Sequence, residues 1–155
     1  DDAETMSEQL ATFLRYSLSK APDSLVQLAD ELQAINAYLQ LQKTRFGDKL
    51  KVNCQIDDTL KRQRIPALLL QPLVENAIKH NNATQENPLT TKILIQANQV
   101  IISNNLQKKS TAEPSTKFGL NYLKSIYKYY SKTDFKTSEK DGNFVCILPL
   151  ISTHS

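Results

Sequence analysis

The residues best suited to chemistry lie near the end of one apolar stretch, residues 65–80, which reads IPALLLQPLVENAIKH. On a helix, residues three or four positions apart share a face, so this stretch divides into an apolar arc and a polar arc. We expect the apolar arc to face the core and the polar arc to line a site. The apolar arc holds Leu70, Val74, Ala77 and Ile78, and the polar arc holds Gln71, Glu75, Asn76, Lys79 and His80.

Asn76 has the most specific chemistry of the polar arc. It lies one turn before His80 and borders the apolar arc at Leu73, so its amide is expected to project from an apolar wall into a cleft. An amide cannot act as a base or a nucleophile, but its oxygen binds hard cations such as Mg²⁺. The alternative is an amphipathic core helix with a polar outer face. The crowding of Glu, Asn, Lys and His into six residues favours the functional interpretation.

Length and composition indicate one soluble globular domain. The chain has 155 residues, of which 40% are hydrophobic and 23% charged, enough to bury one core. The 19 basic and 16 acidic residues give a net charge of +3, and the lysines are dispersed, which argues against nucleic-acid binding. No apolar run approaches the ~20 residues of a membrane span, and no signal peptide is visible.

Two isolated cysteines, Cys54 and Cys146, lie in apolar, strand-like stretches. Because neither belongs to a C-x-x-C pattern or has a nearby His, we expect buried, reduced thiols without a catalytic role.

Apolar residues at helical spacing predict three further helices. One covers residues 4–20. The next begins at a capping box formed by Ser24 and Gln27 and ends before Gly47, which suits a helix C′ position. The last covers residues 118–130. In the central stretch, Pro66 is expected to open the helix, whereas Pro72 either kinks it or moves its start toward Gln71.

Alternating apolar and polar residues predict the strands. Residues 50–57 form one strand, and two short runs around residues 93–95 and 100–102 form a hairpin that turns at Asn98-Gln99. A final hairpin turns at Asp141-Gly142. The simplest architecture is an α+β two-layer sandwich, with two or three helices on one face of a mixed sheet of four or five strands.

The stretch LLQPLVENAIKH at residues 69–80 resembles the N-box of the LytS/YehU-type sensor histidine kinases, whose ATP-binding domain belongs to the GHKL class. The resemblance continues upstream through residues 14–18, 28–42 and 45–50, and it weakens after about residue 98. It implies a Bergerat-type ATP-binding fold with an N-terminal dimerisation helix. The implied parts are residues 1–20 as the second helix of a dimerisation hairpin, residues 21–151 as the ATP-binding domain, and residues 152–155 as a tail.

The resemblance also implies a site in which ATP lies between the N-box helix and a flexible lid. Asn76 would bind Mg²⁺, and Lys79 and His80 would lie near the phosphates. Asn104 stands where the family has an adenine-binding Asp, and its neutral oxygen makes a weaker hydrogen bond than a carboxylate does. Lys117 can meet a phosphate as a point charge. The implied nucleotide contacts are Asn76, Lys79, His80, Asn104, Lys117, Gly119 and Leu120.

The sequence departs from the family pattern at the glycines and at the catalytic groups. Leu106 and Lys108 replace two glycines that would approach the phosphates, and Gly119 remains from a second glycine motif. The family's phosphoacceptor His is followed by Phe, whereas the two histidines here are His80 and His154, so no acceptor is identified.

Glu75 is the one acid of the N-box stretch, and two roles are open to it. In the broader class the activating acid or amide lies one turn before Asn76, where this chain has Pro72, which weakens the case for Glu75 as a general base. Pairing with Lys79 at i+4 suits it at least as well.

The resemblance implies a protein histidine kinase: the ATP-binding catalytic region of a two-component sensor kinase. It would phosphorylate a histidine on an upstream helix, for relay to a response regulator. It also implies a homodimer through the first helix and a cytoplasmic domain of an inner-membrane protein. The alternative is a pseudokinase signalling or protein-interaction module of the same fold, with weak or no nucleotide binding. The stripe expected to form the dimer comprises Met6, Leu10, Phe13, Leu14 and Leu18.

Overall fold

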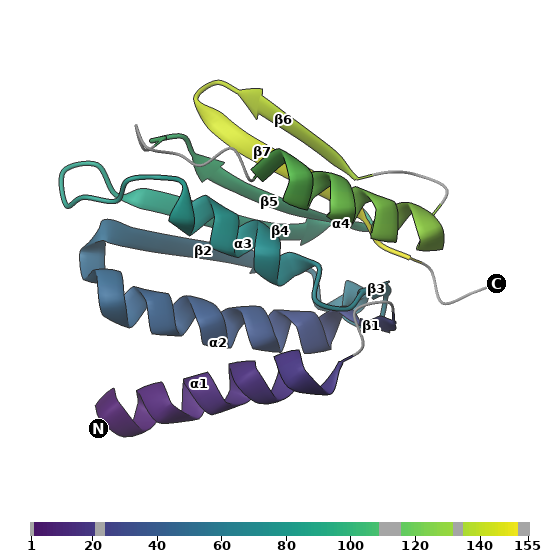
Figure 1. The fold of residues 1–155 in the computed structure, drawn as a ribbon, viewed down its shortest axis with the longest axis horizontal. Helices are drawn as coiled ribbons and strands as arrows, with labels where there is room; N and C mark the ends of the chain where they lie inside the picture. The colour runs from purple at the N-terminus through teal and green to yellow at the C-terminus, as the bar shows by residue number, and fades with distance from the viewer. Residues whose placement is uncertain (1, 21–23, 109–115, 132–134, 152–155) are drawn as a thin grey trace.

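The computed structural model describes residues 2–20, 24–108, 116–131 and 135–151 (Figure 1). Within these ranges the helices match the predicted ones in number and order, and two 3-10 turns flank β2. The helices are α1 (Asp2–Ser19), α2 (Leu28–Phe46), α3 (Leu70–Lys79) and α4 (Thr116–Tyr130), and the turns are η1 (Gly47–Lys49) and η2 (Asp58–Leu60). The strands are β1 (Leu25–Gln27), β2 (Leu50–Ile56), β3 (Arg64–Pro66), β4 (Leu89–Gln96), β5 (Gln99–Asn105), β6 (Lys136–Lys140) and β7 (Asn143–Pro149).

The main sheet has five strands in the order β2-β4-β5-β7-β6. The β2–β4 pair is parallel, and the other neighbouring pairs are antiparallel. The predicted mixed sheet of an α+β fold is therefore confirmed. A second pair, β1 with β3, was not predicted; its strands are three residues each, too short for an alternating pattern to be recognised.

One face of the sheet carries the core. Along β4 and β5 every second side chain is buried, and the antiparallel register places Ile93 opposite Ile102, and Ile102 opposite Cys146. These side chains form one cluster with buried residues of α2, α3 and α4. In Figure 1, α2 lies between α1 and β2, so α1 forms an outer layer. No helix in the described part of the chain is long and apolar enough to span a membrane.

The hairpin turns follow the backbone rule for two-residue loops. Asp141 and Gly142 have φ of 53° and 75°, which confirms the predicted turn. The β4–β5 turn is formed by Ala97 and Asn98, with φ of 51° and 60°, rather than by Asn98-Gln99. The prediction was wrong by one residue because Ala gives no sign of a left-handed conformation.

The start of α2 is capped by the backbone and not by the predicted capping box. The helix begins at Leu28, and the side chain of its N-cap residue Gln27 makes no capping hydrogen bond. Instead, Leu28 N donates to the carbonyl of Gln63 at 2.8 Å and Ala29 N donates to the carbonyl of Lys61 at 3.0 Å. Gly47, with φ of 59°, ends the helix as predicted.

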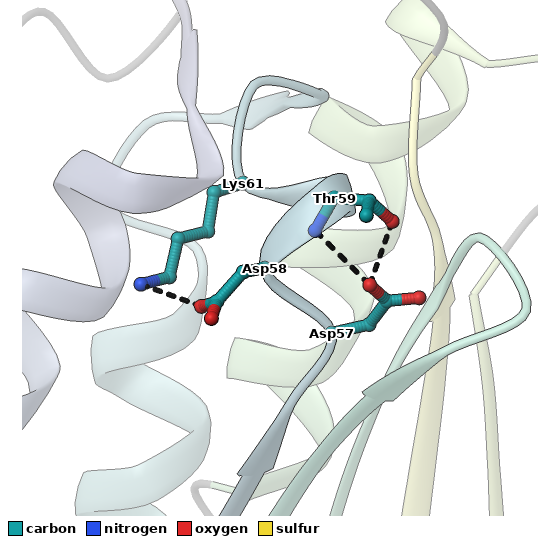
Figure 2. Close-up of polar contacts among 4 residues, drawn as sticks. All are labelled: Asp57, Asp58, Thr59 and Lys61. Atoms are coloured by element: carbon teal, nitrogen blue, oxygen red, sulfur yellow. Dashed lines mark hydrogen bonds and ion pairs between the residues drawn. The ribbon is translucent and has the colours of Figure 1, made fainter.

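The loop that supplies these carbonyls is built on η2 (Figure 2). The carboxylate of Asp57 accepts hydrogen bonds from the backbone N of Thr59 at 3.0 Å and from its hydroxyl at 2.6 Å, which lowers the pKa of Asp57. Lys61 pairs with Asp58 at 2.9 Å. Asp57 thereby ends β2 and turns the chain back toward α2.

α3 begins five residues later than the start of the predicted stretch. Ile65 and Pro66 belong to β3, where Pro66 pairs with Leu25, so the prediction that Pro66 opens the helix was wrong. Leu70 is the first helical residue, which places Pro72 in the first turn, where a missing N–H breaks no intrahelical hydrogen bond. The alternative of a later start near Gln71 is confirmed.

The two cysteines differ in exposure. Cys146 is buried in the core, as predicted. Cys54 is exposed, so its predicted burial was wrong. β2 is an edge strand, and of its residues only Leu50 is buried; alternation along an edge strand does not by itself imply burial.

Candidate functional site

The two arcs predicted for the central helix are confirmed in α3. Its buried residues are Leu70, Leu73, Val74, Ala77 and Ile78. On the polar arc, Gln71, Glu75 and Asn76 are half-buried and Lys79 is exposed. α3 is therefore anchored by its apolar face, and its polar side chains emerge at the edge of the core.

Asn76 occupies the border between these arcs. Its backbone carbonyl accepts from the N–H of His80 at 3.0 Å, and His80, half-buried, forms the C-cap of the helix. Within the described ranges, the side-chain amide of Asn76 has no hydrogen-bond partner. A half-buried amide with unused hydrogen-bonding capacity can bind a ligand that reaches it.

Asn104 is buried at the end of β5, on the face of the sheet that carries the core. Its Nδ2 donates to the carbonyl of Asn105 at 2.9 Å, which fixes the orientation of the amide and leaves Oδ1 as the acceptor. Thr91 lies directly opposite on β4, also fully buried. Its hydroxyl has no partner among residues that the structure describes. Two polar side chains therefore lie together in an otherwise apolar layer, which suits a polar ligand or water.

Asn81 is a residue of the site that the sequence did not reveal. It is buried, its Nδ2 donates to the carbonyl of Ala77 at 2.8 Å, and its Oδ1 accepts from Gln107 N at 2.8 Å. A bridge between Asn81 and Lys108 and a 2.8 Å hydrogen bond from Asn82 N to the carbonyl of Gln107 extend the link. The end of α3 is thus joined to the segment that leaves β5 beside Asn104.

The same link accounts for two residues that replace glycines. Lys108 lies in the bridge to Asn81, and Leu106 N donates to the carbonyl of Gly142 at 2.8 Å. Neither residue is among those with a positive φ in the described structure, so glycine's wider conformational range is not needed here.

Three of the predicted nucleotide contacts fall in the first turns of α4. Lys117, Gly119 and Leu120 are helical, but their side chains lie outside the described residues, as does the loop 109–115. The structure therefore brings Asn76, Lys79 and His80 together on α3 and places Asn104 at the end of β5.

Glu75 does not form the predicted pair with Lys79. Its Oε1 accepts instead from Nε2 of Gln71, one turn earlier, at 3.2 Å. Lys79 makes no ion pair with it in the described part of the chain. Glu75 is therefore hydrogen-bonded to a residue nearer the start of α3 and not to one nearer its end.

The start of α3 is held by a buried acid, Glu31 of α2, whose role was also missed. Its Oε1 accepts from the backbone N of Leu69 at 3.1 Å and of Leu70 at 3.4 Å, and its Oε2 accepts from Leu68 N at 3.2 Å and from the hydroxyl of Tyr16. Burial raises the pKa of Glu31, and the hydrogen bonds that it accepts oppose this rise. Burial beside this carboxylate also raises the pKa of Tyr16. No local pattern reveals this role of Glu31, because the backbone groups that it accepts from lie 37 to 39 residues away.

Two hollows in the described structure lie away from these residues of α3. One, of about 510 Å³, lies over the ends of β4, β5 and β7 and the β6–β7 turn; the other, of about 230 Å³, lies between α1 and α2. Among the described residues no cluster of three His, Cys, Asp or Glu side chains is placed to hold a metal. The first hollow is lined by Thr90, Lys92, Ser103, Asn104, Asn105, Lys140, Asp141, Asn143 and Val145.

Comparison with known proteins finds similarity to histidine kinases. The family model described as "Histidine kinase" matches residues 1–50. Sensor histidine kinase BtsS of Escherichia coli (strain K12) is 47% identical over 83 residues, which cover 54% of this chain and 15% of BtsS. The chain is related to the sensor histidine kinases. It spans much less than two thirds of the length of this curated relative.

Solved histidine kinases share the fold of this chain. The cytoplasmic segment of histidine kinase QseC aligns with a TM-score of 0.57 and 19% identity, covering 97% of this chain and 94% of that segment. Full-length ShkA in complex with AMPPNP aligns with a TM-score of 0.53 and 12% identity, covering 97% of this chain and 36% of ShkA. The predicted resemblance to sensor histidine kinases and the predicted α+β fold are confirmed.

Proposed function

We propose that this chain is the ATP-binding catalytic region of a two-component sensor histidine kinase. The observation that carries the proposal is the amide of Asn76, half-buried at the edge of the core and unpartnered within the described residues. The matched relative is a sensor histidine kinase, and the aligned ShkA structure contains AMPPNP, an analogue of ATP. Residues 1–20 would form the dimerisation helix, and residues 21–151 the ATP-binding domain.

The donor set on α3 fits Mg²⁺ bound together with a nucleotide. Mg²⁺ retains waters and takes few protein ligands when phosphates supply the remaining oxygens. One amide oxygen, from Asn76, satisfies that requirement, and an acidic cage is not needed. Lys79 and His80, in the next turn, would lie near the phosphates, and Lys117 remains a proposed phosphate contact.

The buried polar pair on the sheet fits a nucleobase. Asn104 Oδ1 is oriented as an acceptor, and an adenine amino group is a donor. The unpartnered hydroxyl of Thr91 would gain a hydrogen bond from the base or from a water beside it. Guanine offers a carbonyl at the position of the adenine amino group, so this arrangement selects adenine.

Bound Mg-ATP would supply the phosphoryl group for a histidine outside this chain, and a response regulator would then receive it. This chain's own residues bind and orient the nucleotide, since phosphoryl transfer depends on positioning and electrostatics. Its homodimer would form through α1, and the domain would be cytoplasmic in an inner-membrane protein.

One observation favours a second candidate, a pseudokinase module of the same fold. Leu106 and Lys108 are held in an extended, hydrogen-bonded segment where close backbone approach to phosphate would favour glycine. In that case the domain would transmit signals by conformation or by binding a partner, and it would bind nucleotide weakly or not at all.

Calorimetric titration of the chain with AMPPNP, with and without Mg²⁺, separates these candidates. We expect weak, Mg²⁺-dependent binding that Asn76→Ala abolishes. Asn36→Ala is the matched control, because Asn36 is exposed on α2. No heat at millimolar AMPPNP for the unaltered chain would establish the pseudokinase instead.

A further inference from the structure

We propose that Glu31 is the positioning residue of α3, and that Tyr16 and Ser17 make the placement of α3 depend on α1. Two hydrogen-bonded chains run from α1 to α3, and both end on the helix that carries Asn76. Asn76 binds Mg-ATP only if the proposed function is correct, so the effect on nucleotide rests on that proposal; the link between the helices does not.

The first chain begins at the N-terminal end of α3. The first backbone N–H groups of a helix have no partner within the helix, and a buried helix end must find acceptors elsewhere. Leu69, the N-cap residue, makes no side-chain capping hydrogen bond. Glu31 supplies the acceptors, with one carboxylate for the N–H groups of Leu68, Leu69 and Leu70. A negative charge is also stabilised at a helix N-terminus.

Water cannot readily replace this carboxylate. Glu31 is only 2% exposed, and its side chain comes from α2, whose own start is fixed by carbonyls of the η2 loop. The buried carboxylate of Glu31 therefore sets the position of α3 along its axis, and α2, which carries Glu31, is itself held in place. Removing the acceptor would leave three backbone donors without a partner in an apolar environment.

The hydroxyl of Tyr16 brings α1 to the same carboxylate. It donates to Oε2 of Glu31, the oxygen that also accepts from Leu68 N. Within the described ranges Glu31 forms no ion pair, so Tyr16 is the side chain that helps the carboxylate remain charged while buried. Displacing α1 would remove this donor and weaken the hold of Glu31 on α3.

The second chain follows the polar arc of α3. The hydroxyl of Ser17 donates to Oε1 of Gln71 at 3.2 Å, and Nε2 of Gln71 donates to Oε1 of Glu75 at 3.2 Å. Glu75 immediately precedes Asn76. Tyr16 therefore reaches the start of α3 through Glu31, and the neighbouring Ser17 contacts the side chains that lead to Asn76.

The outer face of α1 is apolar and exposed. Phe13 packs against Tyr38 of α2 with ring centroids 5.4 Å apart, but large apolar side chains on α1 stay exposed. A second copy that covers them would therefore contact α1 directly, and any movement of α1 that follows would act on Tyr16 and Ser17. The two hydrogen-bonded chains would carry that movement to α3. The exposed side chains are Met6, Leu10, Leu14 and Leu18.

Amide hydrogen exchange in the 155-residue chain tests the link between the helices. In Tyr16→Phe, and more strongly with Ser17→Ala added, the amides of residues 68–76 should exchange about tenfold faster, as expected for loss of one charge-assisted hydrogen bond. Tyr38→Phe is the matched control. It removes a hydroxyl from the same α1–α2 contact, and that hydroxyl makes no hydrogen bond within the described residues. Unchanged exchange in residues 68–76, or equal acceleration in every helix, would overturn the proposal.

Two further measurements connect the link to the site. Glu31→Gln keeps the shape of the side chain but loses one acceptor oxygen, and it should accelerate the same amides more than Tyr16→Phe does. Titration with AMPPNP and Mg²⁺ should give severalfold weaker binding in Tyr16→Phe and unchanged binding in Tyr38→Phe. Equal affinities in the two variants would refute the effect on the site. If the unaltered chain binds no AMPPNP, the proposed function fails, while the exchange measurement still decides whether Glu31 positions α3.

Discussion

The side-chain oxygen of Asn81 accepts a hydrogen bond from the backbone N–H of Gln107 at 2.8 Å. This contact joins the end of α3 to the segment that follows β5, across 26 residues of sequence. It brings the helix of Asn76 and the strand of Asn104 into one unit. The two halves of the proposed nucleotide site are therefore positioned relative to each other by a buried amide that contacts both.

Asn81→Ala should destabilise the fold and weaken nucleotide binding. The substitution leaves the N–H of Gln107 and the carbonyl of Ala77 without their partner, at a cost of about 2 kcal/mol in free energy of unfolding. Urea denaturation measures the cost. Asn82→Ala is the control, because Asn82 takes part through its backbone and its side chain is exposed. Equal stability of the two variants would show that the Asn81 side chain does not hold the segment.

Asn104→Asp should strengthen adenine binding and lower stability. A carboxylate accepts a stronger hydrogen bond from the adenine amino group, so affinity for AMPPNP should rise about fivefold. The same change removes the donor to the carbonyl of Asn105 and buries a charge, so the free energy of unfolding should fall by about 1–3 kcal/mol.

Paired titrations with AMPPNP and the corresponding guanosine analogue distinguish recognition of the base from a general effect. Asn36→Asp, on the exposed face of α2, controls for added negative charge. An equal change for both nucleotides would contradict a role of Asn104 in reading adenine.

Features set by neighbours in sequence were predictable, and those set by distant contacts were not. Apolar spacing predicted both faces of α3, because the residues on the buried face of a helix recur about every 3.6 positions in the sequence. The start of α3 was misplaced because its cap is Glu31, 38 residues before Leu69. Likewise, the start of α2 is capped by carbonyls of Lys61 and Gln63, which no local pattern reveals.

The residues of the candidate site also divide into those set by neighbours in sequence and those set by distant contacts. Asn76, Lys79 and His80 share one helix, so their proximity follows from spacing alone. Asn104 was placed by the family resemblance, whereas its neighbour Thr91 emerged from strand register, which depends on the position of the β4–β5 turn.

Leu10→Glu should reduce self-association of the chain. Met6, Leu10 and Leu14 are between 40% and 47% exposed and recur every four residues, so they form one apolar stripe on α1. Burial of this stripe against a second copy would be opposed by a charge at its centre. Sedimentation equilibrium should show a dimer for the unaltered chain and a monomer for Leu10→Glu. Asn36→Glu adds the same charge at an exposed position on α2, away from the stripe, and it should leave the mass unchanged. A single mass for all three proteins would rule out α1 as the dimer contact.

Cys54 should react with a thiol reagent in the folded chain, and Cys146 should not. Burial raises the pKa of Cys146 to about 12, so at pH 8 only about one thiol in ten thousand is the reactive thiolate. Cys54 is exposed on β2, although partial burial of its thiol raises its pKa as well, so its reaction should be slow at pH 8 and accelerate as pH rises. Reaction with DTNB should release one equivalent from the folded chain and two in urea. Cys54→Ser should release none until it unfolds. Release from folded Cys54→Ser would show that the core around Cys146 is open.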